Sequence, residues 1–62
     1  MTFKKETYKT DGGVIMYVTH LYEYGYSNAL IAFKSGDFYN EKFESEKDFN
    51  TFVSVNDFEL SK

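Results

Sequence analysis

The hydrophobic pattern is densest over residues 14–24, where β-branched and aromatic residues run almost without interruption. Such residues favour an extended, pleated backbone. Alternation divides this segment into two faces, and neither face is cleanly polar. The faces consist of Val14, Met16, Val18, His20, Tyr22 and Tyr24 on one side, and Ile15, Tyr17, Thr19, Leu21 and Glu23 on the other. A strand with apolar residues on both faces is typical of the centre of a sheet, so we expect the fold to be built around it.

Turn signals around this segment predict an antiparallel meander. The glycines of residues 11–13 (Asp-Gly-Gly) accept a positive φ without steric cost, which predicts a hairpin between a first strand and the central one. Residues 25–28 (Gly-Tyr-Ser-Asn) predict a loop, and residues 35–37 (Ser-Gly-Asp) predict a further turn. The four expected strands are residues 2–10, 14–24, 29–34 and 38–44.

The period of the pattern changes after the fourth strand. Ser45 opens the sequence Ser-Glu-Lys-Asp, which fits an N-terminal capping motif. The helical spacing of Phe49, Phe52 and Val53 then predicts a helix over residues 46–55 that must pack on the sheet, because a helix this short does not persist alone in water. Residues 57–61 fit a short final strand, an extended tail or a continuation of the helix. The sequence thus predicts one α+β domain over residues 1–62: a four-stranded antiparallel meander with one short C-terminal helix on one face and a possible fifth strand.

The predicted helix is too small to cover both faces of the predicted sheet. A helix of ten residues is about 15 Å long and covers only one face of a four-stranded sheet. Because the central strand is apolar on both faces, we expect a tyrosine-rich part of the second face to stay exposed or to be covered by another molecule. Exposed aromatic patches mark interfaces. The alternative is that the tyrosines pair across strands as ordinary side chains of a solvated face.

Composition excludes several classes of protein. The 62 residues include no cysteine and one histidine, so neither disulfides nor a thiolate or histidine-rich metal site is expected, and we predict no cofactor. Aromatic residues make up 21% of the chain and must supply most of the core. Neither a signal peptide nor an apolar run long enough to span a bilayer is recognisable, so we expect a cytoplasmic protein without membrane contact.

Candidate chemistry is sparse. His20 is the only imidazole, and a catalytic role would require a serine and an acid brought to it by the fold; no nucleophile motif is present. We therefore expect a histidine on a strand face and no enzymatic activity. Five acids of the C-terminal half lack the spacing of a calcium loop and predict a solvated acidic surface instead of a metal site. They are Asp37, Glu41, Glu44, Glu46 and Asp48.

The charge of −3, the small size and the arginine-free composition rich in Lys, Asn, Tyr and Phe resemble those of small orphan proteins from AT-rich bacteriophage genomes. The resemblance implies that such a chain binds and blocks a host enzyme, and that an acidic one occupies a site meant for DNA.

Our leading hypothesis is a non-enzymatic protein-binding module whose partner is a DNA- or RNA-handling host protein. In it the five acids mimic phosphates, and Tyr22, Tyr24 and Tyr26 anchor the contact. A second hypothesis is a structural homodimer formed through the sheet. The third is single-stranded nucleic-acid binding by a sheet face, which ranks behind a protein partner because the chain has no RNP-type string and no arginine. The residues considered for it are Tyr8, Tyr17, Tyr22, Tyr24, Lys4, Lys5 and Lys9.

Overall fold

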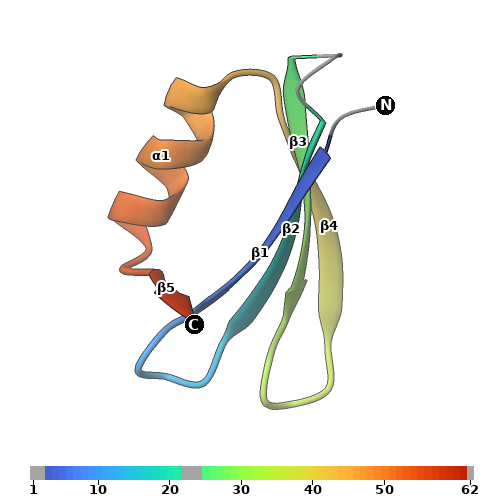
Figure 1. Cartoon of the computed structure of the whole chain (residues 1–62). Coiled ribbons are helices and arrows are strands. Elements are labelled where there is room, and N and C mark those ends of the chain that lie inside the picture. Colours follow the sequence, from blue (N-terminus) through green and yellow to red (C-terminus); the bar gives the residue numbers. More distant parts are fainter. Residues whose placement is uncertain (1–2, 22–24, 62) are drawn as a thin grey trace.

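The computed structural model describes residues 3–21 and 25–61 and confirms the predicted α+β class (Figure 1). Five antiparallel strands form one sheet in the order β4-β3-β2-β1-β5, so the predicted central strand does lie at its centre. The elements are β1 (Phe3–Lys9), β2 (Ile15–Leu21), β3 (Tyr26–Ala32), β4 (Phe38–Phe43), α1 (Glu46–Val55) and β5 (Glu59–Ser61).

The first hairpin forms where the glycines predict it. The Thr10 N–H donates to the Val14 carbonyl at 3.0 Å, and Gly13 has a φ of 87°, which is in the region that glycine adopts at no cost. The resulting register pairs Lys9 with Ile15 and Phe3 with Leu21.

The third strand begins earlier than predicted. Residues 25–28 were expected to form a loop, but β3 starts at Tyr26, and Ser27 and Asn28 pair with His20 and Thr19 of β2. The prediction was wrong because small polar residues favour loops locally, whereas here the long neighbouring strand supplies backbone partners for them. The strand also ends earlier, at Ala32, and the Phe33 N–H closes the next turn by donating to the Asp37 carbonyl at 2.8 Å.

The helix has the predicted boundaries because both of its ends are capped. The Ser45 Oγ accepts a hydrogen bond from the Asp48 N–H at 3.1 Å. At the other end Asp57 adopts a left-handed φ of 56°, and the Phe58 N–H donates to the Val53 carbonyl at 3.0 Å. This pair of features is a Schellman motif, with aspartate where glycine is usual. It turns the chain back so that β5 pairs with β1, which decides in favour of a final strand.

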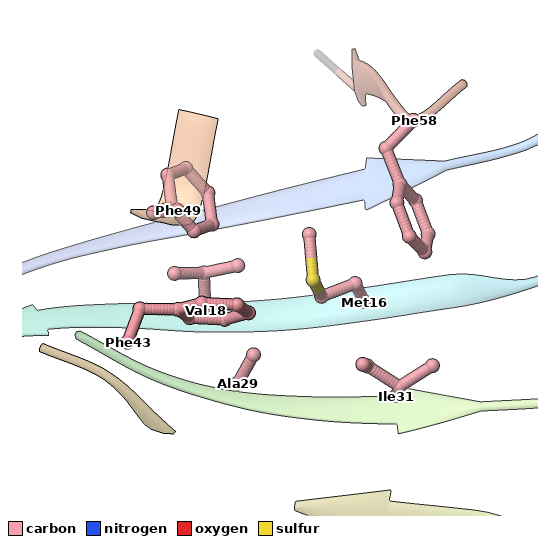
Figure 2. Packing of buried hydrophobic residues seen from close by; sticks show 7 residues of the cluster. All are labelled: Met16, Val18, Ala29, Ile31, Phe43, Phe49 and Phe58. Atoms are coloured by element: carbon pink, nitrogen blue, oxygen red, sulfur yellow. The ribbon is translucent and has the colours of Figure 1, made fainter. Parts of the chain in front are cut away.

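The core lies between α1 and the sheet (Figures 1 and 2). Phe49 of the helix is its centre: its ring lies 5.3 Å from that of Phe43 and 5.5 Å from that of Tyr8. All buried apolar residues in the described part of the chain belong to this one layer, and those of β2 come from the even-numbered face. They are Met16, Val18, Ala29, Ile31, Phe43, Phe49 and Phe58.

The opposite face of the sheet has no covering element among the described residues (Figure 1). It carries the odd-numbered residues of β1 and β2 and the even-numbered residues of β3 and β4, since opposed residues of antiparallel strands point to the same side. Several of its large side chains are exposed: Phe3 by 52%, Ile15 by 37%, Tyr17 by 51% and Phe38 by 68%. We call this side the uncovered face.

Candidate functional site

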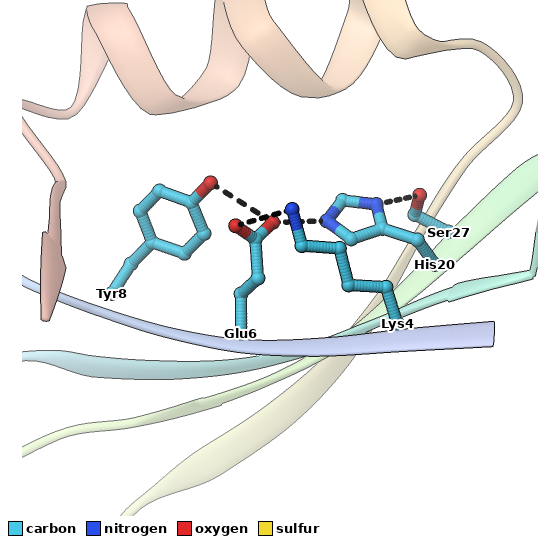
Figure 3. A network of polar contacts seen from close by, with 5 residues as sticks. All are labelled: Lys4, Glu6, Tyr8, His20 and Ser27. Carbon is cyan, nitrogen blue, oxygen red and sulfur yellow. Dashed lines mark hydrogen bonds and ion pairs between the residues drawn. The ribbon is translucent and has the colours of Figure 1, made fainter. Parts of the chain in front are cut away.

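One candidate site is a polar cluster under the helix, centred on His20 (Figure 3). The strand register places His20 opposite Lys4 of β1 and opposite Ser27 of β3. The imidazole uses both nitrogens: Nδ1 lies 2.7 Å from the Ser27 Oγ, and Nε2 lies 2.7 Å from Oε1 of Glu6. The fold therefore brings a serine and an acid to the only histidine of the chain.

Glu6 is the common acceptor of this cluster. The Tyr8 hydroxyl donates to its Oε1 at 3.3 Å, and the Lys4 Nζ lies 3.5 Å from its Oε2. Its side chain is only 14% exposed and that of His20 only 12%. Burial acts to raise the pKa of Glu6, but the hydrogen bond from His20 and the positive charge of Lys4 together outweigh it and hold the pKa below the usual value. The carboxylate is thus stabilised in its charged form.

The cluster forms the floor of a cleft of about 350 Å³ between β1 and the first turns of α1. Glu46, Phe49 and Asn50 line the helix side of the cleft. The order Ser27–His20–Glu6 is that of a nucleophile, a base and an orienting acid, which is the arrangement used in acyl transfer.

That reaction also requires N–H donors aimed at the developing oxyanion. Ser27 lies within β3, where it pairs with His20 of β2 and with Phe43 of β4. The backbone of β3 at this point therefore belongs to two strand ladders, whereas an oxyanion site needs N–H groups that are not used in the sheet. The Phe49 ring stands edge-on to the imidazole with centroids 4.9 Å apart and restricts access from the helix side. Every buried side-chain nitrogen and oxygen of the described residues has a partner, so the cluster is a satisfied polar network within the core layer.

The second candidate site is the uncovered face, whose composition follows directly from the register. Three rows of side chains run across β1 to β4. The first row is Lys9, Ile15, Ala32 and Phe38; the second is Thr7, Tyr17, Leu30 and Asn40; the third is Lys5, Thr19, Asn28 and Lys42. The face therefore combines an apolar centre with a row of polar and cationic groups.

Charge is divided unevenly between this face and the rest of the molecule. Lys5, Lys9 and Lys42 are exposed on it, and Glu59, paired with Lys9, is its only strand acid among the described residues. Apart from these residues and Glu44, the described part of the chain holds three lysines and seven acids, none of them at a strand position of this face. Glu44 lies at the corner of the face, with its Oε1 3.7 Å from the Lys42 Nζ. Both side chains are exposed, so this ion pair contributes little to stability.

The residues predicted to bind a partner do not form one surface among the described residues. Tyr22 and Tyr24 lie outside the described residues, and of Tyr26 only the backbone, at the start of β3, is described. Asp37 precedes β4 and Glu44 follows it, so a strand of six residues, about 20 Å, separates them.

The other three predicted acids have different surroundings. Glu41 points to the helix side of the sheet, since it pairs with the buried Ala29, and it is half-buried. Glu46 and Asp48 lie in the first turn of α1, where they complement the positive end of the helix dipole.

The sequence did not single out Glu6, Ser27, Phe3, Phe38 or Lys42. Alternation within each strand assigns these residues to faces, but only the register between strands shows which faces coincide. A first hairpin fixed at residues 11–13 would already have placed Glu6 beside Val18 and Lys5 beside Thr19.

Comparison of the chain with protein-family models, with curated proteins and with solved structures finds no match. Within residues 3–21 and 25–61, no helix is long and apolar enough to cross a membrane. The same part of the chain holds no group of three or more acidic, histidine or cysteine side chains placed to bind a metal ion.

Proposed function

We propose that this protein is a small non-enzymatic binding module that contacts its partner through the uncovered face. The observation that carries the proposal is the exposure of Phe3, Ile15, Tyr17 and Phe38 on that face, while α1 occupies the other. Exposed apolar side chains gathered on one face of a folded domain are typical of an interaction surface.

The surroundings of His20 support a binding role over a catalytic one. Its hydrogen bonds to Glu6 and Ser27 satisfy polar groups that the helix would otherwise bury unpaired. The network links β1, β2 and β3, and it keeps the sheet rigid beneath the uncovered face.

The acids predicted to mimic phosphates are distributed over the two ends of β4, the helix side of that strand and the start of α1. We therefore place the contact on the uncovered face and not on these acids. Reversing the charge of Glu46 or Asp48, in the first turn of α1, is expected to leave binding unchanged, whereas mimicry of nucleic acid would require their negative charge.

Affinity capture from the cells that express the chain tests the proposal. A Tyr17→Ser/Phe38→Ser double variant is expected to lose the species that the wild type captures, because it removes two exposed rings of the uncovered face. Val55→Ser is the matched control, since Val55 is 74% exposed on the helix and not on the sheet. Capture that is the same for all three proteins would contradict the proposal.

A homodimer formed through the same apolar side chains is the second candidate. Sedimentation over about a hundredfold dilution separates it from the first, because an obligate dimer loses mass and stability on dilution. A monomer of constant stability over that range would eliminate the homodimer.

A further inference from the structure

We propose that the partner which fits the uncovered face is a single-stranded nucleic acid. This inference rests on the proposed function, because it requires that the face be a contact surface. Three features carry it: the sign of the charge on the face, the spacing of its rings and the polar groups beside them.

The charge on the uncovered face is opposite to that of the molecule. Its three exposed lysines outnumber the described acids on it and at its corner, Glu59 and Glu44, whereas the chain as a whole carries −3. A polyanion is therefore attracted to this face and repelled by the remaining surface, which orients its approach. Local clusters of lysines, and not net charge, neutralise the phosphates that a strand brings with it.

The exposed rings lie along a diagonal of the sheet. From strand and residue spacings, Phe38 and Tyr17 are about 12 Å apart at Cα, and Tyr17 and Phe3 about 14 Å apart. Rings on a flat sheet surface stack with unpaired bases, and such platforms accept roughly 4–16 nucleotides. The length of the diagonal fits a strand at the short end of that range. Lys9 lies on one side of the diagonal and Lys42 on the other.

Polar groups lie beside the diagonal of rings. Asn28 and Asn40 are exposed on the same face, and Thr19 lies in the row that joins Lys5 to Lys42. Amide and hydroxyl groups at these positions supply donors and acceptors for base edges and sugar oxygens.

Other occupants fit the face less well. A nucleic-acid duplex keeps its base faces stacked inside, so it offers the rings nothing to stack on. In a two-fold dimer the same patch meets itself, which brings the lysines of one copy towards those of the other. A protein partner remains an outcome of the experiment below.

The test is a fluorescence-anisotropy titration of a fluorescein-labelled oligothymidylate of about 16 nucleotides with the full chain. Saturable binding is expected at low salt, with a slope of log K against log salt of about −2, since three lysines each contribute about 0.7. A duplex of the same length is expected not to compete.

Variants make the titration specific to the face. Tyr17→Ala is expected to weaken binding about 5- to 150-fold through the loss of one stacked base, and Tyr17→Phe to retain it. Lys9→Gln is expected to reduce the salt slope by about 0.7, and Lys47→Gln, an exposed lysine of α1, to leave it unchanged. Thermal melts of each variant verify that it is folded.

Two results would overturn the inference: no saturable binding at low salt, or binding that Tyr17→Ala and Lys9→Gln leave intact. The capture experiment keeps this failure apart from a failure of the proposed function. Capture that depends on the uncovered face but survives nuclease treatment would indicate a protein partner, and would preserve the proposed function while rejecting the nucleic acid.

Discussion

At the scale of single residues, Glu6 shows how a small core tolerates charge. Its carboxylate is mostly buried, yet it accepts hydrogen bonds from His20 and Tyr8 and lies beside the Lys4 ammonium. Removing any one donor leaves the acid less compensated, and an uncompensated buried charge is strongly destabilising. We therefore expect the hydrogen bond between Glu6 of β1 and His20 of β2 to stabilise the pairing of these strands in addition to the apolar contacts.

This environment predicts a specific loss of stability in acid. The pKa of Glu6 in the folded protein lies below its usual value of 4.5, so the unfolded chain takes up the proton first as the pH falls. The stabilisation is complete above about pH 4.5 and is lost as the pH decreases through the folded pKa. Glu6→Gln should flatten the decrease in unfolding free energy in this range, as measured by urea denaturation at several pH values.

Glu46→Gln is the control for this prediction, because Glu46 is an exposed acid of the helix. If the two variants and the wild type lost stability in parallel on acidification, Glu6 would not be the source of the effect.

The sequence allowed part of this cluster to be foreseen. His20 was expected on a strand face without catalytic function, and its position on the strand is as predicted. Glu6 and Ser27 were missed because they belong to other strands, and Ser27 was assigned to a loop. The side chains that a histidine meets depend on register, which local patterns do not contain.

At the scale of elements, the turns and caps account for the agreement between sequence and structure. The helix boundaries were predictable because Ser45 caps the first turn and the stripe from Phe49 sets its face. Its last turn was less clear, because Asp57 in a left-handed conformation replaces the glycine that normally signals a helix end. The start of β3 was missed because its pairing with β2 outweighs the loop preference of its own residues.

Two adjacent glycines provide a test of the first hairpin. Gly13 has a positive φ, and a Cβ added to it would lie 2.5 Å from the Lys34 Cε, whereas a Cβ on Gly12 would meet only the Thr10 Oγ1 at 3.7 Å. Gly13→Ala should destabilise the protein by about 1–3 kcal/mol. Gly12→Ala should change stability by less than about 1 kcal/mol, in the stabilising direction.

Chemical denaturation of both variants measures this difference. Equal effects of the two substitutions would indicate that Gly13 does not have a positive φ in the hairpin.

At the scale of the whole molecule, one helix covers one side of a five-stranded sheet. The sequence predicted that only one face of the sheet would be covered, because the helix is short and both faces of the central strand are apolar. It did not predict which face stays open, since the two faces of residues 14–24 have similar hydrophobicity. The face that packs against α1 is the one that carries Met16 and Val18, and these pair with Ile31 and Ala29 of β3.

Substitutions of aromatic residues on the two faces should have very different costs. Phe49 is 3% exposed, so Phe49→Ala should cost about 3–5 kcal/mol. This is a large part of the roughly 3–9 kcal/mol that a domain of this size has available. Phe38→Ser, on the uncovered face, should change the unfolding free energy by less than about 0.5 kcal/mol.

Thermal melts followed by circular dichroism give both values. A strongly destabilised Phe38→Ser variant would mean that the face is already covered in the isolated protein.

The central claim is that one side of this sheet is open to solvent in the isolated molecule and available for contact. Ile15 and Ile31 test it most directly, because they lie on neighbouring strands, at 37% and 1% exposure, on opposite faces. The measurement is the relaxation of their methyl protons by a soluble paramagnetic agent, recorded by NMR on the dilute protein. Our account predicts fast relaxation at Ile15 and slow relaxation at Ile31, and equal protection of the two methyl groups would contradict it.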